Sequence, residues 1–197
     1  STRKESSAAS DVYKRQNMEH IKRVGRTLKH KGSILSFYED DIMTPDGNVA
    51  KWDFIEHSGA AAVIPVLDDG RILLVRQFRN ALDRETLEIP AGGINKGEEA
   101  YAAAMRELEE ETGYKTDRLT HLVSLVTAVA FCNEIIEVYT AKNLCKTQQH
   151  LDEDEFIDVE SYTEDEITDM IYSGKIQDSK TIAAIMAYIN KTKHTMQ

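Results

Sequence analysis

Three glutamates, Glu107, Glu110 and Glu111, are spaced so that they share one face of a helix. Residues 100–112 contain neither Pro nor Gly and are rich in strong helix formers, and Gly113 stands where a helix usually ends. Like charges at this spacing repel one another by roughly a few tenths of a kcal/mol per pair. A hard divalent cation, which prefers oxygen ligands, would offset that repulsion. The spacing therefore predicts a metal-binding face on this helix.

The segment before the helix completes a longer pattern. Gly92 is followed after five residues by Glu98, and Arg106 begins the run RELEEETGY. A Glu-rich run on its own is usually a solvated acidic face. Here the glycine loop, the arginine, the carboxylates and the final glycine together fill every position of a gapped signature, which is far more specific than a lone glycine motif. This signature is the Nudix box, and the chain resembles the Nudix hydrolases.

The resemblance implies the hydrolysis of a phosphoanhydride, in which metal-bound carboxylates neutralise charge and help to activate water. It implies that Mg²⁺, or Mn²⁺ as a substitute, is held by three carboxylates and one backbone carbonyl. These metal ligands are Glu107, Glu110, Glu111 and Ala91. Glu98 and Arg106 are expected to shape the junction of loop and helix, with Arg106 pairing to a carboxylate. A direct catalytic part stays open for both residues, and a simple surface ion pair is the alternative.

Three further stretches are similar to the ADP-ribose pyrophosphatase branch of that family. They are residues 76–79 (RQFR), 87–92 (LEIPAG) and 151–155 (LDEDE). The similarity implies cleavage of ADP-ribose to AMP and ribose 5-phosphate by a homodimer whose N-terminal strands cross to the partner. Val129 stands where this branch usually has a proline, so a broader nucleoside-diphosphate-sugar pyrophosphatase is an alternative. A non-catalytic Nudix-fold ligand sensor is the alternative from another functional class.

Arginines at the end of the predicted strand 72–78 could bind a substrate phosphate through a bidentate contact. Arg76 and Arg79 point to nearly opposite sides because their spacing is odd. The resemblance favours Arg79, since the branch has a substrate arginine at that position. It also implies that Glu88 is a substrate-side or metal-network carboxylate and that Glu134 binds substrate. The alternative for Glu88 is a surface residue at a strand edge.

The acidic loop at residues 150–155 could supply a general base outside the metal shell, because the attacking water must be oriented and partly deprotonated. The resemblance places this base at Glu153. Glu155 is the second candidate, since loop registers are easily misplaced by two residues, and Glu110 within the box is the third. A solvated acidic loop is the alternative interpretation.

Composition and charge narrow the functional class. The chain has 197 residues, of which 41% are hydrophobic and 29% are charged, and its formal net charge is −10. This charge argues against sequence-independent nucleic-acid binding. No apolar run approaches the roughly 20 residues that a membrane span requires, and no signal peptide is visible. The two cysteines, Cys132 and Cys145, are too few for a disulfide framework, so we expect a cytoplasmic protein without a membrane partner.

The predicted elements follow the order strands, helix, strands, helices, which predicts an α/β fold with a mixed sheet between helical layers. This agrees with the Nudix-type α/β/α sandwich, to which an N-terminal β-hairpin section is added. The predicted strands are residues 21–28, 33–43, 49–56, 60–67, 72–78, 86–91, 119–130, 134–141 and 156–159, and the predicted helices are 100–112, 163–173 and 180–190. Residues 1–17 are expected to be a non-native or disordered tail, residues 18–56 a dimerising β section, and residues 57–197 the Nudix hydrolase domain.

Overall fold

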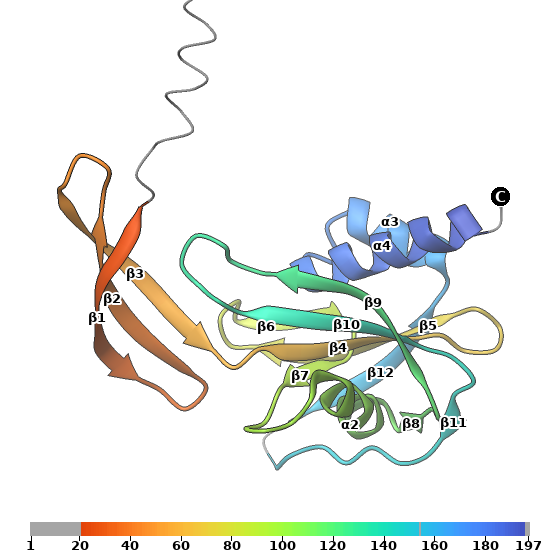
Figure 1. Cartoon of the computed structure of the whole chain (residues 1–197). Helices are drawn as coiled ribbons and strands as arrows, with labels where there is room; N and C mark the ends of the chain where they lie inside the picture. Colours follow the sequence, from red (N-terminus) through yellow and green to blue (C-terminus); the bar gives the residue numbers. More distant parts are fainter. Residues whose placement is uncertain (1–20, 154, 196–197) are drawn as a thin grey trace, which may run out of the picture. The chain divides into compact units, whose positions relative to one another are not determined.

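The computed structural model describes residues 21–153 and 155–195. The chain divides into two compact units, of which the first ends at Glu56 and the second begins at His57. The elements of the first unit are β1 (Lys22–Lys31), β2 (Leu35–Met43) and β3 (Val49–His57), the last of which ends at the boundary (Figure 1). The predicted tail at residues 1–17 and the loop residue Asp154 lie outside the described residues.

The first unit is an antiparallel sheet in the strand order β1-β2-β3. A turn at residues 44–48 joins β2 to β3: Asp46 accepts hydrogen bonds from Thr44 and Asn48, and Gly47 has a φ of 84°. A glycine tolerates this left-handed conformation without the steric cost that a side chain would add. The predicted hairpin is therefore confirmed, with β1 as a third strand beside it.

The first unit has few buried side chains. Asp40 and Ile42 are its only described buried residues. The guanidinium of Arg26 donates two hydrogen bonds to Asp40, at 2.6 and 2.7 Å, and lies 3.7 Å from the ring centroid of Phe54. Many large apolar side chains of this unit are exposed instead; they are Ile21, Val24, Leu28, Ile34, Leu35, Met43, Val49 and Trp52.

The second unit contains two main sheets and three described helices. The strands are β4 (Ala60–Pro65), β5 (Ile72–Arg79), β6 (Arg84–Glu88), β7 (Ala91–Gly93), β8 (Tyr114–Lys115), β9 (Leu119–Val126), β10 (Ile135–Ala141), β11 (Cys145–Lys146) and β12 (Ile157–Tyr162). The helices are α2 (Ala100–Thr112), α3 (Glu164–Tyr172) and α4 (Ser179–Thr195). One sheet has the order β7-β4-β10-β9, with β4 and β10 parallel and the other neighbours antiparallel, and the other has the antiparallel order β12-β5-β6. Strands β8 and β11 form a separate pair.

Helix α2 covers one side of the sheets, and α3 and α4 cover the other (Figure 1). The completely buried strand β4 shows why, because successive side chains on a strand point to opposite faces. Ala61 and Val63 belong to the apolar cluster that contains Leu108 of α2. Ala62 and Ile64 belong to the cluster that contains residues of α3 and α4. The predicted α/β/α sandwich with a mixed sheet is therefore confirmed.

Helix boundaries follow their capping residues closely. Helix α2 spans the predicted residues and ends at Gly113, whose φ is 67°. Thr163 and Glu166 form a reciprocal capping box at the start of α3, where each side chain accepts a backbone N–H of the other. Asp178 accepts the N–H of Thr181 at the start of α4. Helix α4 runs five residues beyond the predicted end, because residues 191–195 contain no Pro or Gly that would stop it.

Two predicted strands differ most from the structure. The predicted strand 119–130 ends at Val126, and a loop follows it. The predicted strand 86–91 is two strands, β6 and β7, on either side of Pro90. Proline has no N–H to donate to a sheet, so the pairing changes there from β5 to β4. No helix in the described part of the chain is long and apolar enough to cross a membrane.

Candidate functional site

Glycine at position 92 allows strand β7 to lie directly against a carboxylate of α2. A Cβ built on Gly92 would stand only 2.0 Å from Oε1 of Glu107. The loop that follows contains Gly97, with a φ of 83°, and it closes on itself through Glu98. The side chain of Glu98 accepts the N–H of Asn95 at 2.9 Å, and the backbone N–H of Glu98 donates to the Asn95 carbonyl at 3.0 Å.

Arg106 connects this loop to the acidic face of α2. Its guanidinium donates to Glu98 at 3.0 and 3.1 Å, to Glu107 at 2.6 Å and to Glu110 at 2.8 Å. It also donates to the Gly93 carbonyl at 3.1 Å. The hydrogen bonds that Glu98 accepts, first from Arg106 and then from the Asn95 N–H, hold the pKa of Glu98 down at about 2. The expected pairing of Arg106 with a carboxylate is present, and it involves three carboxylates.

Two of the three box glutamates are buried. Glu107 is 8% exposed and Glu111 is 3% exposed, whereas Glu110 lies at the surface edge of the helix. Burial raises the pKa of Glu107, although its pairing with Arg106 opposes the shift. Burial, followed by the charge of Glu107, raises the pKa of Glu111 to about 8, against a single backbone hydrogen bond from the Ala91 N–H at 3.0 Å. A buried carboxylate is costly when ionised unless a cation compensates it.

The oxygen atoms of this face suit a hard divalent cation. Within the described residues, one oxygen each of Glu107, Glu110 and Glu111 receives no hydrogen bond. No three His, Cys, Asp or Glu side chains among those residues are already arranged as a complete metal site, and Arg106 holds two of the carboxylates. The backbone of Ala91 contacts the same face through its N–H. Side chains that supply free oxygens and buried charge fit Mg²⁺ chemistry, which uses few carboxylates together with substrate oxygens.

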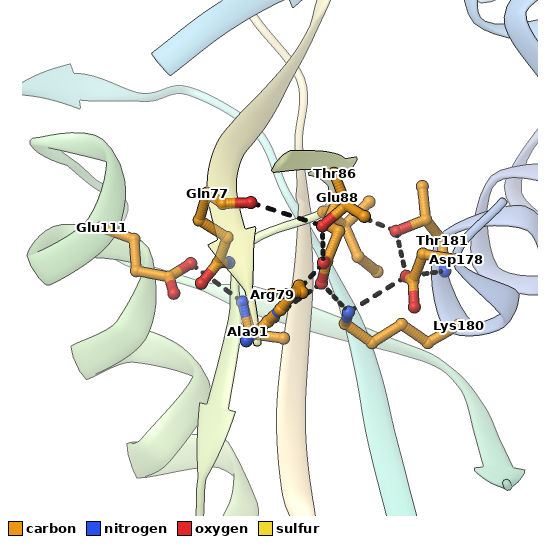
Figure 2. Close-up of polar contacts among 10 residues, drawn as sticks. Gln77, Arg79, Thr86, Glu88, Ala91, Glu111, Asp178, Lys180 and Thr181 are labelled. Atoms are coloured by element: carbon orange, nitrogen blue, oxygen red, sulfur yellow. Dashed lines mark hydrogen bonds and ion pairs between the residues drawn. The ribbon is translucent and has the colours of Figure 1, made fainter. Parts of the chain in front are cut away.

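Arg79 and Glu88 form a pair beside this face. The guanidinium of Arg79 donates through Nε and Nη2 to the two Glu88 oxygens, both at 2.7 Å. Glu88 is 2% exposed, so the surface-residue alternative for it is wrong. The positive charge of Arg79 favours the ionised form of Glu111 and so opposes part of the rise in the pKa of Glu111. In Figure 2, Arg79 lies between Glu111 and Lys180.

Sequence reasoning missed Lys180. Its ammonium group pairs with Glu88, and it also donates to Asp178 at 3.0 Å. Thr86 adds a hydrogen bond of 2.5 Å to Glu88. Burial by itself would raise the pKa of Glu88, but the bonds from Arg79 and the charge of Lys180 outweigh it and hold that pKa at about 2. The sequence predicted a helix from residue 180, but it gave no signal that joins Lys180 to a residue 92 positions earlier.

The acidic loop lies near the box helix at its later end. The His150 N–H donates to the Glu110 carbonyl at 3.0 Å, and Gln149 donates to the Glu111 carbonyl at 2.6 Å. The charge of Glu155 contributes, after burial, to the raised pKa values of both Glu107 and Glu111. Glu153 is exposed, and among the described residues it has no side-chain partner. Glu155 is exposed as well, and its carboxylate accepts the N–H of Asp152 at 3.2 Å, so the two glutamates differ in that only the charge of Glu155 acts on the carboxylate face.

Glu134 lies at the start of the segment that leads into β10. It accepts a hydrogen bond from Thr127 at 2.6 Å and lies 3.5 Å from Nδ1 of His57. Val129, in the same loop, is 82% exposed. A cavity of about 640 Å³ lies elsewhere in the second unit. Residues of β9, β10 and α4, such as Thr120, line it, and none of the predicted site residues does. Within the described residues, the side-chain partners of Glu134 are therefore Thr127 of its own loop and His57, and neither belongs to the box helix.

Comparisons with known proteins agree with this geometry. Residues 56–185 match the family described as the NUDIX domain. The chain belongs to the Nudix family. It is 39% identical over 166 residues to an ADP-ribose pyrophosphatase of Bacillus subtilis (strain 168), with 83% of this chain and 90% of that protein covered. It is 41% identical over 156 residues to a methanol dehydrogenase activator of Bacillus methanolicus, with 78% and 84% covered.

A solved structure supports the same Nudix fold. The crystal structure of an ADP compounds hydrolase matches with a TM-score of 0.80 and 20% identity, covering 91% of this chain and 97% of that one. The predictions of a Nudix hydrolase and of its α/β/α fold are confirmed. Nudix hydrolases generally use a divalent metal. The roles of individual residues and the nature of the metal stay predictions.

Proposed function

We propose that this Nudix hydrolase cleaves the phosphoanhydride of ADP-ribose, giving AMP and ribose 5-phosphate, with Mg²⁺ as the metal and Mn²⁺ as a substitute. The observation that carries the proposal is the pair of buried carboxylates, Glu107 and Glu111, against which Gly92 lies without a side chain. Two buried acids with raised pKa values are costly for a fold that does not use them. The names of the relatives from Bacillus subtilis and Mycobacterium tuberculosis support the substrate.

Glu107, Glu110, Glu111 and the Ala91 carbonyl would hold the metal. The bound cation would neutralise phosphate charge and lower the pKa of a water. Arg106 has a separate part, because it holds Glu107 and Glu110 and fastens the helix to Glu98 and the glycine loop. Arg106 and Glu98 therefore orient the carboxylates in this proposal.

Arg79 would bind a phosphate of the substrate, and Glu88 would fix the orientation of its guanidinium. The support is that 40% of the Arg79 side chain is exposed while its carboxylate partner is buried. Charge-assisted bidentate pairs of this kind impose a defined geometry on the arginine. Glu134 stays a candidate substrate contact from its own loop.

The general base would come from the acidic loop, at Glu153 as the resemblance predicts or at Glu155. The charge of Glu155 acts on Glu107 and Glu111, which favours Glu155. A catalytic base must come within hydrogen-bond reach of the water that it deprotonates. Glu110, which faces the same helix side, is the remaining candidate.

Substrate breadth is the main alternative. Val129 replaces the proline of the ADP-ribose branch, and a mouse ADP-sugar pyrophosphatase is 39% identical over 99 residues, with 45% of each chain covered. A non-catalytic sensor would have no need of three carboxylates on one helix face. The activator from Bacillus methanolicus shares as much sequence as the pyrophosphatases do, so an effect on a partner enzyme is a second candidate function.

We also propose that the protein is a homodimer, in which the first unit contributes the contact. The support is that a sheet with so few buried side chains exposes eight large apolar ones. Isolated small sheets are marginal in water, and exposed apolar patches of this kind mark interfaces.

A turnover screen tests the substrate. ADP-ribose, ADP-glucose, GDP-mannose, NADH, diadenosine polyphosphates and CoA are compared at equal concentration, each with Mg²⁺ and with Mn²⁺. We expect ADP-ribose to have the highest kcat/KM. A higher value for another nucleoside diphosphate sugar would establish the broader activity. The absence of turnover with every compound would favour the sensor or the activator.

A further inference from the structure

Glu88 is a buried carboxylate that two cations from distant parts of the chain share. Arg79 of β5 reaches it with two hydrogen bonds of 2.7 Å, and Lys180 of α4 pairs with its Oε2. The Lys180 side chain is itself only 12% exposed. In Figure 2, Arg79 lies on the side of Glu111 and Lys180 on the side of Asp178, and both reach the Glu88 carboxylate. Glu88 therefore has two cationic partners, Arg79 and Lys180, for its one negative charge.

Arg79 keeps one nitrogen that Glu88 does not hold. Glu88 occupies Nε and Nη2 of Arg79, and within the described residues Nη1 has no hydrogen-bond partner. Hydrogen bonding to Glu88, with a smaller contribution from the charge of Glu111, raises the pKa of Arg79. The guanidinium therefore lies within electrostatic reach of the box helix while two of its nitrogens are held.

Charge balance gives Lys180 a specific part. An arginine paired alone with one carboxylate forms a neutral unit, which attracts an anion weakly. Lys180 gives the same carboxylate a second cation. Because Asp178 also pairs with Lys180, the four side chains together are neutral, and the part of Lys180 is to keep Glu88 paired when Arg79 turns toward an anion. Asp178 faces Lys180 at the N-cap of α4 and is also bonded by Thr181. Coulomb interactions among such poorly exposed groups are stronger than between groups in water.

We propose that Lys180 is a positioning residue for Arg79: it shares the buried carboxylate of Glu88 and so keeps the charge of Arg79 available to a phosphate group of the substrate. This inference rests on the proposed function, in which Arg79 binds that phosphate. Lys180 itself does not touch the substrate. Without it, Glu88 depends on Arg79 alone, and the guanidinium cannot turn toward an anion without leaving a buried carboxylate poorly compensated.

A purely structural part for Lys180 makes a different prediction. Lys180 could simply fasten α4 to β6, in which case its loss would lower stability and leave ligand affinity unchanged. Affinity measured on the folded protein separates these two cases. A second test is whether the effect of losing Lys180 on ligand affinity requires Arg79, because a purely structural effect would be the same without the arginine.

The experiment compares the full-length parent with Lys180→Met, Lys180→Gln, Lys180→Arg, Arg79→Gln and the double variant of Lys180→Met with Arg79→Gln. Ile167→Val is the matched control, since it removes one methyl group from a completely buried site on α3 that belongs to the apolar core and carries no charge. Binding of inorganic pyrophosphate with Mg²⁺ is measured by calorimetry. KM and kcat for ADP-ribose and the melting temperature are measured on the same samples.

We expect Lys180→Met and Lys180→Gln to weaken pyrophosphate binding and to raise KM by about tenfold, the order of effect that a poorly compensated buried charge produces. Lys180→Arg should restore the parent values, and Lys180→Met should have little further effect when Arg79 is already Gln. Ile167→Val should lower only the melting temperature.

Several results would overturn the inference. One is an unchanged pyrophosphate affinity in both Lys180→Met and Lys180→Gln. Another is a loss of affinity from Lys180→Met that is equally large in the parent and in the Arg79→Gln protein. If the parent binds pyrophosphate but does not cleave ADP-ribose, the proposed substrate is wrong and the pyrophosphate series still decides the part of Lys180. A parent that binds neither compound overturns both proposals.

Discussion

The Gly92→Ala variant tests whether the carboxylate of Glu107 takes part in the reaction. A Cβ at position 92 would lie 2.0 Å from Oε1, 2.2 Å from Cδ and 2.5 Å from Oε2 of Glu107. Real Cβ atoms essentially never approach another heavy atom within 3.0 Å. The closest oxygen must therefore move by 3.0 − 2.0 = 1.0 Å or more.

The fold should survive this change. The crowded atoms are the end of a flexible side chain, and Gly92 does not have a positive φ. Alanine at a compatible position stabilises a protein by about 0.4–1 kcal/mol through the unfolded chain. The weakened contact of Glu107 with Arg106, now 2.6 Å, opposes this by about 1–3 kcal/mol. We expect a net loss of roughly 2 kcal/mol or less.

The effect on activity should be much larger. A misplacement of about 1 Å in a catalytic site can cost about a hundredfold in rate. We expect kcat/KM for ADP-ribose to fall by about that factor, as measured by the release of AMP at saturating Mg²⁺. Gly93→Ala is the matched control, because a Cβ there meets nothing within 4 Å. Parent activity in a folded Gly92→Ala protein would refute the part given to Glu107, as would an equal loss in Gly93→Ala.

Three further predictions concern the loop, the assembly and acid stability. Glu155→Gln should lower kcat far more than KM if Glu155 is the base, and Glu153→Gln should do so if the register of the resemblance holds; kinetics that leave both variants at the parent rate would move the base to Glu110. Light scattering at low micromolar concentration should show a dimer, and Leu28→Glu on the exposed apolar surface of the first unit should give monomers, whereas a fully active parent monomer would contradict the dimer. Because the pKa of Glu88 is about 2 in the folded protein and ordinarily 4.5, its pairing contributes stability above pH 4.5 that is lost as the pH falls toward 2. Urea unfolding at several pH values should show this loss, roughly 3 kcal/mol at most, and Glu88→Gln should flatten it.

The sequence alone predicted the framework of the site well. Residues 100–112 form a helix because of their composition, and Gly113 ends it with a positive φ, as expected. The start of the helix predicted at residues 163–173 was visible because threonine is a favoured cap, and the structure adds Glu166 as its reciprocal partner. Such local signals need no knowledge of the tertiary structure, and a completely apolar run such as β4 is almost as direct.

Contacts between distant residues could not be predicted in the same way. The Lys180–Glu88 pair depends on how α4 packs beside β6, and no periodicity records it. The reason for glycine at position 92 also appears only in the structure, where the Glu107 carboxylate occupies the space of a side chain. In the acidic loop, composition identified the segment, but its register depends on the backbone path beside α2.

The proposed function requires the buried carboxylate face of α2 to hold a divalent metal while ADP-ribose is cleaved. The most direct measurement is the rate of AMP formation from ADP-ribose, with and without Mg²⁺, by the parent and by Glu111→Gln. We predict metal-dependent cleavage by the parent and a loss of about a hundredfold or more in the variant, which should remain folded because Gln at this buried position adds no charge. Equal rates in the two proteins, or cleavage that is independent of the metal, would contradict the claim.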